Sequence, residues 1–121
     1  MTQHSDRLRQ LQIPLTEAQF QKQVTDLAEY QGWQWLHVEQ RSGNANGSGW
    51  HTPIKGPLGK GFPDLMLVRG HRLLFVELKS QKGILSEAQK RVLWGYLGWV
   101  GEVHVWRPSD WAEISEVLAN A

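Results

Sequence analysis

Apolar residues recur at helical spacing in one part of this chain and alternate with polar residues in the next, and this pattern predicts its elements. Apolar positions in residues 20–28 follow a helical period, and Gly32 is placed to end the helix. Residues 16–19 (Thr-Glu-Ala-Gln) form a capping box ahead of this run, with Thr16 as the N-cap. Residues 33–39 then alternate, which predicts a first strand.

Two apolar strands joined by a tight turn are predicted at residues 63–79. Gly70 suits the first central position of a two-residue hairpin loop, because glycine adopts positive φ without steric cost. With Gly70 and His71 in the loop, Arg69 faces Arg72, and a four-residue loop gives the same register. Continued outward, that register sets the pairing of the whole hairpin.

The remainder of the chain predicts a helix, a strand and a second helix. Residues 86–89 (Ser-Glu-Ala-Gln) form a second capping box, and Gly98 or Gly101 closes the helix that it starts. The predicted inner face of that helix consists of Val92, Leu93, Tyr96, Leu97 and Val100. Residues 103–106 predict a strand, and Pro108 begins a last helix. Its predicted inner face consists of Trp111, Ile114, Val117 and Leu118.

The predicted element order is α-β-β-β-α-β-α, an α/β fold with a mixed four-stranded sheet flanked by helices. The hairpin is apolar on both faces, so helices must cover both. The helix between the last two strands requires a crossover and hence a parallel pair. We expect a flexible N-terminal arm at residues 1–15 and a single domain at residues 16–121. A Gly-rich loop at residues 42–61 is expected either as a mobile flap over a substrate backbone or as a solvent-exposed insertion.

Composition limits the class of protein. The chain has 121 residues, of which 40% are hydrophobic, as expected for one globular domain. The absence of cysteine excludes disulfides and thiolate metal sites. No apolar run approaches the roughly 20 residues of a membrane span, and the polar N-terminus lacks a signal core. We therefore expect a cytoplasmic protein without a membrane partner. The seven tryptophans are expected in the core and, in part, on a dimer surface.

Three charged side chains stand at one end of the otherwise apolar hairpin, namely Asp64, Glu77 and Lys79. The predicted register puts Asp64 opposite Glu77, and Lys79 shares their face. Carboxylates with Cβ atoms roughly 5 Å apart repel unless one is protonated or a cation lies between them. Such oxygen ligands suit Mg²⁺ or Mn²⁺, and Lys79 can then orient a water or stabilise charge on a phosphate. The alternative is that these are ordinary solvent-facing charges at a strand end.

Recognition of a nucleic acid requires a local basic patch here, because the net charge of the chain is only +1. The candidate DNA-binding residues are Lys55, Lys60, Lys82, Lys90 and Arg91. They lie in the Gly-rich loop and in the segment after the second hairpin strand, on either side of the predicted site in the sequence.

Four segments together resemble the virus-type replication-repair nuclease (VRR-NUC) domain of the PD-(D/E)xK nuclease superfamily. They are residues 61–64 (Gly-Phe-Pro-Asp), 76–79 (Val-Glu-Leu-Lys), 85–89 (Leu-Ser-Glu-Ala-Gln) and 103–110 (Val-His-Val-Trp-Arg-Pro-Ser-Asp). The resemblance covers residues 16–118 and is to the stand-alone form found in phages and prophages. It implies a restriction-endonuclease-like core and Mg²⁺- or Mn²⁺-dependent hydrolysis of DNA phosphodiesters.

The resemblance also implies roles for individual residues. The implied metal ligands are Asp64, Glu77 and the backbone carbonyl of Leu78, and the implied catalytic lysine is Lys79. Gln89 matches the family's catalytic glutamine, although the capping box requires this residue type for structural reasons alone. Glu17 matches an additional acidic metal ligand of the superfamily, although an acid is favoured in a first helical turn in any case.

The expected function is that of a structure-selective endonuclease that acts on branched DNA such as a Holliday junction. A homodimer is expected because a four-way junction has two-fold symmetry. A sequence-preferring nuclease is a variant of this class, against which the lack of a specificity domain argues. The alternative from a different class is a non-catalytic nucleic-acid-binding or assembly protein that retains the fold, against which the intact set of acidic residues and lysine argues. His37 on the first strand is a further candidate to face the site.

Overall fold

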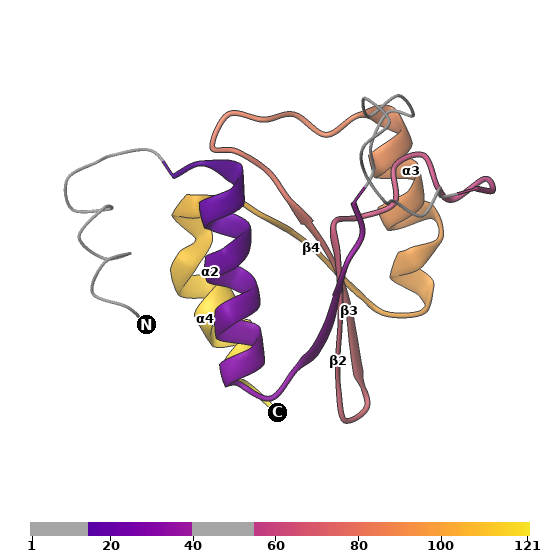
Figure 1. Cartoon of the computed structure of the whole chain (residues 1–121). Coiled ribbons are helices and arrows are strands. Elements are labelled where there is room, and N and C mark those ends of the chain that lie inside the picture. Colours follow the sequence, from indigo (N-terminus) through magenta and orange to yellow (C-terminus); the bar gives the residue numbers. More distant parts are fainter. Residues whose placement is uncertain (1–14, 40–54) are drawn as a thin grey trace, which may run out of the picture.

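A four-stranded mixed sheet lies between two layers of helices, as Figure 1 shows. The structure is a computed structural model that describes residues 15–39 and 55–121. Most of the predicted N-terminal arm and residues 42–54 of the predicted Gly-rich loop lie outside these ranges. The strands follow the order β1-β2-β3-β4 and are β1 (Gln34–His37), β2 (Leu65–Arg69), β3 (Arg72–Leu78) and β4 (Glu102–Trp106). The predicted α/β fold with a mixed sheet is confirmed.

The first two α-helices begin where the sequence predicts, whereas Pro108 begins a short 3-10 helix and the last α-helix follows it at Trp111. The helices are α2 (Glu17–Tyr30), α3 (Glu87–Gly95) and α4 (Trp111–Ala119), with the short 3-10 helices η1 (Leu97–Trp99) and η2 (Pro108–Asp110). Both capping boxes form, with Thr16 and Ser86 as the N-caps. Gly32, with φ of 89°, follows the end of α2. Within residues 15–39 and 55–121, no helix is both long and apolar enough to cross a membrane.

The hairpin has the predicted register. Gly70 adopts φ of 61° in a two-residue loop, and Arg69 pairs with Arg72. At the other end of the ladder Leu65 pairs with Val76 in an antiparallel arrangement. Strand β3 pairs with β4 in parallel, as the crossover through α3 requires. The residues that precede β2 and end β3 are therefore brought together at the open end of the hairpin.

Helices α2 and α4 cover one face of the sheet and α3 covers part of the other (Figure 1). The larger core lies under α2 and α4, with Trp33, Leu74 and Trp106 almost fully buried. The smaller core lies under α3, with Phe75 and Val92 at its centre. The side chains of a strand alternate between the two cores, which explains why the hairpin sequence is apolar on both faces.

Helix α3 is shorter than its apolar pattern predicts. It ends at Gly95 rather than at Gly98 or Gly101, and Tyr96 leaves the helical conformation with φ of −129°. Tyr96 and Val100, predicted on the inner face, are 53% and 66% exposed. Glycine is a weak helix former, so the chain turns away from the sheet at this point. These two predictions of burial are wrong.

Two arginines at the hairpin turn bind the C-terminal end of α4. The Arg69 guanidinium donates to the carbonyl oxygens of Leu118, at 2.7 Å, and of Asn120. The Arg72 guanidinium donates to the Asn120 carbonyl at 2.9 Å and to the Glu102 carboxylate at 2.7 and 2.8 Å. The last carbonyls of a helix lack partners within the helix and carry partial negative charge, so they and Glu102 offset the repulsion between the paired arginines.

Candidate active site

Asp64 and Glu77 meet at the open end of the hairpin. Asp64 lies directly before β2, and its Oδ2 accepts a hydrogen bond of 2.8 Å from the backbone N–H of Leu78. The carboxyl groups of Asp64 and Glu77 lie close enough for each to affect the pKa of the other. Buried Pro63 fixes the chain that enters β2 and so positions Asp64. The predicted pairing of these two acids across the hairpin is therefore present in the structure.

Glu77 is a buried acid held by two further side chains. Its exposed fraction is only 4%. The Lys79 ammonium lies 3.7 Å from Oε2 of Glu77, and the Gln89 amide donates to the same oxygen at 2.8 Å. Lys79 is itself mostly buried, with 18% of its side chain exposed. The residues at positions 64, 77, 79 and 89 thus form one connected group.

The amide of Gln89 makes two contacts, one within the capping box and one with Glu77. Its Oε1 accepts the backbone N–H of Ser86 at 2.8 Å, which completes the capping box, while its Nε2 donates to Glu77. The two ends of one side chain therefore start α3 and orient the buried carboxylate. Only an amide can do both, since a carboxylate has no N–H to donate.

Burial sets the protonation of the acid pair. Desolvation, and then the charge of Asp64, raises the pKa of Glu77 to about 7, although the nearby Lys79 ammonium opposes the change. Desolvation also raises the pKa of Asp64, although the N–H of Leu78 opposes it. A pair of this kind retains a proton near neutral pH unless a cation compensates its charge. A perturbed acid pair in a cleft is also a frequent mark of a functional site.

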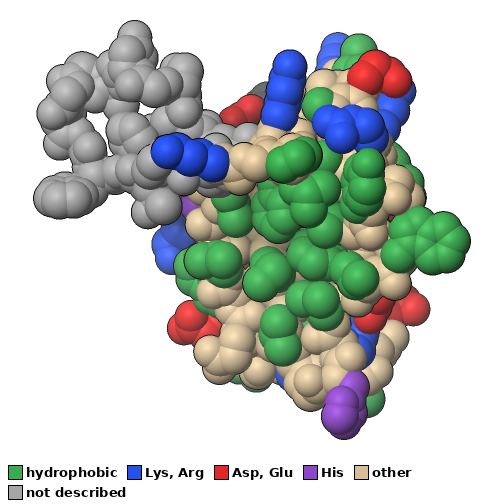
Figure 2. All heavy atoms as spheres, turned by 90° about the vertical axis from the view of Figure 1, so that its right-hand side faces the viewer, with side chains coloured by type: hydrophobic (Ala, Val, Ile, Leu, Met, Phe, Trp, Pro, Cys, Tyr) green, Lys and Arg blue, Asp and Glu red, His purple; other side chains and the backbone are tan. Residues whose placement is uncertain are grey.

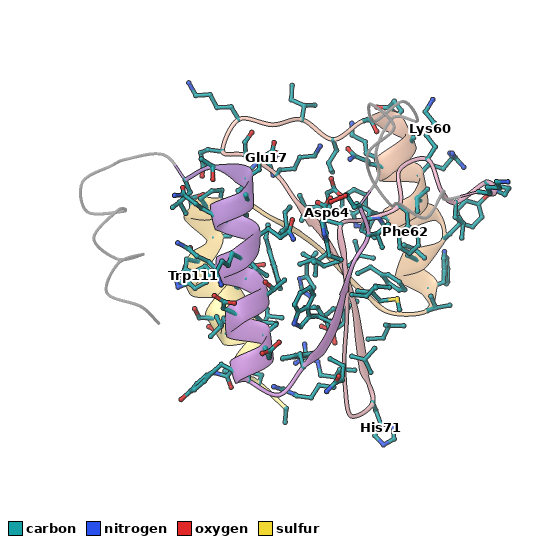
Figure 3. The ribbon with its side chains drawn as sticks, in the orientation of Figure 1. Glu17, Lys60, Phe62, Asp64, His71 and Trp111 are labelled. Carbon is teal, nitrogen blue, oxygen red and sulfur yellow. The ribbon has the colours of Figure 1, made fainter. Side chains whose placement is uncertain are left out.

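A cleft of about 320 Å³ opens over the acid pair. It lies between the first turn of α2, where Glu17 is placed, and the start of α3, as Figure 3 shows around Asp64. The lining residues are Glu17, Gln21, His37, Val38, Glu39, Gly61, Phe62, Asp64, Glu77, Ser86 and Gln89. The cleft is mostly polar and open to solvent, so it suits a charged and extended substrate better than a small apolar ligand.

The oxygen donors in the cleft fit a hard divalent cation. In an extended strand the N–H and C=O of one residue point to the same side, so the Leu78 carbonyl faces the Asp64 side with its N–H. Two carboxylates and one carbonyl leave open positions that water and a phosphate would fill, as Mg²⁺ prefers. Within the described ranges, no three His, Cys, Asp or Glu side chains lie close enough together to hold a metal ion by themselves. Glu17 lines the same cleft without completing such a set.

The basic residues predicted to bind DNA are not gathered into one patch by contacts among themselves. Lys55, Lys60, Lys82 and Arg91 are exposed, and Lys90 forms an ion pair of 3.2 Å with Glu87. Lys60 directly precedes the lining residue Gly61 and lies near α3 in Figure 3. Their contact with DNA stays a prediction.

Seven of the eleven lining residues lie outside the predicted set of catalytic, metal-binding and DNA-binding residues. His37, the further candidate from the first strand, is one of them, and it reaches the cleft from the end of β1. Gln21 and Glu39 were missed. Gln21 follows Glu17 by four residues, which places both side chains on the same face of the helix. This spacing could have identified Gln21 once Glu17 was a candidate. Glu39 lies just past β1 and carries no comparable signal.

Comparisons of the chain with models of known protein families, with curated proteins and with solved structures find no match. The resemblance to VRR-NUC domains therefore stays a prediction from the motifs.

Proposed function

We propose that this chain is a metal-dependent DNA endonuclease of the VRR-NUC kind, selective for branched DNA such as four-way junctions. The observation that carries the proposal is the connected group of Asp64, Glu77, Lys79 and Gln89 in an open polar cleft. A buried acid pair is costly to keep in a fold. Its retention beside a lysine, at the end of two otherwise apolar strands, is explained if the pair binds a cation and acts on a phosphodiester.

The proposed metal ligands are Asp64, Glu77 and the carbonyl of Leu78, with Mg²⁺ or Mn²⁺ as the cation. When bound, the metal would supply Lewis-acid stabilisation of charge on the phosphate. Gln89 holds the Glu77 carboxylate in place through its 2.8 Å hydrogen bond. Glu17 lines the same cleft, where its carboxylate can hold a water.

Lys79 has the position of a group that acts on the reacting phosphate. Its ammonium lies beside Glu77 and is largely shielded from bulk water. In such a setting a fixed positive charge stabilises developing negative charge more strongly than it does in water. Lys79 would therefore orient the attacking water and stabilise the negative charge that develops on the phosphate oxygens.

Recognition would depend on DNA shape and backbone rather than on base sequence. The net charge is only +1, and the candidate basic residues that adjoin the cleft in sequence are exposed lysines, which contact phosphates. Lys60 and Lys90 are the nearest candidates in sequence, because each adjoins a lining residue, Gly61 and Gln89 respectively. A protein with these contacts would select a bent or branched backbone that fits the open cleft.

The test is cleavage of end-labelled four-way junction, flap, single-stranded and linear duplex DNA of shared sequence, with Mg²⁺ or Mn²⁺. Wild-type protein should cut the junction fastest, and chelator or Lys79→Ala should lower the single-turnover rate by at least about 100-fold, as expected for loss of one charge-stabilising group. Lys22→Ala is the control, because Lys22 is an exposed residue of α2 that pairs with Asp26.

Failure of folded wild-type protein to cut any of these substrates would overturn the proposal. Metal-independent binding to the same DNA would then favour the non-catalytic binding protein. Equal cleavage of junction and linear duplex would retain the nuclease and reject its selectivity for branched DNA.

A further inference from the structure

A short connection between β3 and α3 lies beside the candidate site. It consists of residues 79–86 and runs along the end of the molecule at which Asp64 lies (Figures 1 and 3). Its last residue, Ser86, caps α3 and lines the cleft. Two residues of extended chain span at most about 7 Å, so Ile84 lies within about two base steps of a DNA strand from this edge of the cleft.

Hydrogen bonds hold the turn within this connection against η2. The Gly83 N–H donates to the Ser80 carbonyl at 3.1 Å, which closes the turn. The Gln81 amide donates to the Ser109 hydroxyl at 2.8 Å and accepts the backbone N–H of Ser109 at 3.1 Å. The Arg107 guanidinium donates to the Gly83 carbonyl at 2.5 Å. A turn fixed in this way loses little conformational freedom when the side chains that it exposes bind a partner.

The fixed turn presents one large apolar side chain and one lysine to solvent. Ile84 is 83% exposed. Lys82 is also exposed, and within residues 15–39 and 55–121 no acidic side chain forms an ion pair with it. Isolated apolar side chains are common on protein surfaces. Ile84 differs from these because it is held, next to a lysine, at the edge of a polar cleft.

An apolar side chain beside a cation matches the way in which proteins deform DNA. Such proteins contact phosphates through lysine or arginine and insert an apolar side chain between neighbouring base pairs. Figure 2 shows several lysine and arginine side chains along the upper margin of the molecule, the end to which the turn belongs. Insertion requires unstacking, and this cost is lowest where the stack is already interrupted, as at a branch point. A protein partner would need a wider apolar area than one isoleucine offers.

We propose that Ile84 inserts into the base stack at the branch point of a DNA junction whose backbone lies in the cleft, with Lys82 on an adjoining phosphate. Ile84 then determines specificity, because linear duplex resists insertion more strongly than a branch point does. Gln81 is a positioning residue, because it holds the turn on η2 through Ser109. The inference rests on the proposed function for the choice of DNA as the partner, and it requires no catalysis.

The first test is the fluorescence of 2-aminopurine at the branch point of a four-way junction, measured in the Lys79→Ala background so that the DNA stays uncut. Binding is followed separately by the anisotropy of a dye on one arm, and fluorescence is compared at saturation. The parent protein should raise the fluorescence, because insertion unstacks the probe, and a probe in the middle of an arm should not respond. Ile84→Ser should lose the rise, Ile84→Leu should retain it, and Gln81→Ala should lower it.

Tyr30→Ser is the matched control for the fluorescence test. Tyr30 is also 83% exposed, but it is the last residue of α2, whereas Glu17 at the cleft is the first. This variant should leave the rise unchanged. Because Ile84 is so exposed, Ile84→Ser should not alter the melting temperature, and loss of folding then cannot explain loss of the signal.

The second test is the ratio of single-turnover cleavage rates on junction and on linear duplex, in otherwise wild-type protein. Ile84→Ser should lower this ratio by at least about 10-fold, as expected for loss of one contact with a base stack. A ratio that Ile84→Ser leaves unchanged would overturn the proposal.

Three results of the fluorescence test would also overturn it. They are no binding of the junction, binding without a rise at the branch point, and a rise that persists in Ile84→Ser. A rise that depends on Ile84 in a protein that cuts no DNA would retain the insertion and reject the nuclease. Cleavage of the junction without the rise would retain the nuclease and reject the insertion, so the two proposals can fail separately.

Discussion

At the scale of single residues, Gln89 links local helix formation to the chemistry of the site. A capping box accepts either Gln or Glu at its third helical position. In α2 the equivalent Gln19 accepts from the N–H of Thr16 at 2.9 Å and does not line the cleft. In α3 the same geometry places the amide N–H₂ of Gln89 against Glu77. The two capping boxes of the chain therefore differ in the surroundings of their glutamine, because only the amide of Gln89 reaches Glu77 in the cleft.

We expect Gln89→Glu to destabilise the metal-free protein at pH 8 by about 1–3 kcal/mol, because it replaces a hydrogen bond with repulsion of Glu77. Gln19→Glu should change stability by less than about 0.5 kcal/mol, because it keeps the other capping box and meets no buried acid. Urea denaturation in chelator measures both. The loss of stability in Gln89→Glu should shrink at pH 5, where Glu77 is protonated, and an equal loss in the two variants would contradict this account.

At the scale of elements, the turn before β2 packs directly on the backbone of α3. Gly61 adopts φ of 94°, and a Cβ at this position would lie 2.6 Å from the carbonyl carbon and oxygen of Ala88. This close approach brings the chain that leads to Asp64 against the helix that carries Gln89. Glycine at position 61 therefore sets the distance between the two halves of the site.

We expect Gly61→Ala to lower the free energy of unfolding by at least about 2 kcal/mol more than Gly56→Ala does. Gly56 has φ of 103°, and a Cβ at this position would have no heavy atom within 4 Å, so Gly56→Ala introduces the same backbone strain without the clash. Urea denaturation compares the two variants. Equal losses would show that the left-handed conformation, and not the packing on α3, makes Gly61 necessary.

The elements also show which features a sequence can predict. Thr16 and Ser86 cap their helices through contacts with residues only three positions away. Gly70 fixes the hairpin register within its own turn. The helix caps and the register depend on local sequence alone, so both features were predicted correctly. Tyr96 and Val100 were wrongly placed in the core, because apolar residues at helical spacing mark an exposed apolar face as well as a buried one.

Contacts between distant elements left no signal in the local pattern. The approach of Gly61 to Ala88 and the hydrogen bond from Gln89 to Glu77 both depend on how α3 packs against the sheet. The acid pair could be predicted because the register of one hairpin sets it. The cleft could not, because Gln21 and Glu39 reach it from α2 and from the end of β1.

At the scale of the whole molecule, the buried acid pair of the candidate site lowers the free energy of unfolding near neutral pH. The pKa of Glu77 rises from its usual 4.5 to about 7 in the folded state. The folded protein therefore binds this proton more tightly than the unfolded chain does, and unfolding releases it between these pH values. Stability must fall as the pH rises from about 4.5 to about 7, and the loss persists above that range, by about 3 kcal/mol for Glu77 alone. The raised pKa of Asp64 acts in the same direction.

Glu77→Gln should remove most of the stability loss that accompanies the rise in pH. The amide has no charge to desolvate, and its oxygen can still accept a hydrogen bond from Gln89. In metal-free buffer at pH 8 the variant should melt higher than wild type, on the order of 10 °C for a domain of this size, and the difference should narrow toward pH 5. Glu87→Gln is the control, since Glu87 is exposed and should leave the pH dependence of melting unchanged.

Addition of Mg²⁺ or Mn²⁺ makes the same experiment a test of the metal site. A cation that binds only the folded, ionised pair stabilises wild type by mass action, so the melting temperature at pH 8 should rise with metal concentration. The rise should be small at pH 5, where protons compete for the same carboxylates, and it should be absent in Glu77→Gln at either pH. A wild-type melting temperature that is flat from pH 5 to pH 8 would show that the pKa of Glu77 is not raised into this range by folding. An equal response to metal in wild type and Glu77→Gln would place the cation elsewhere on the molecule.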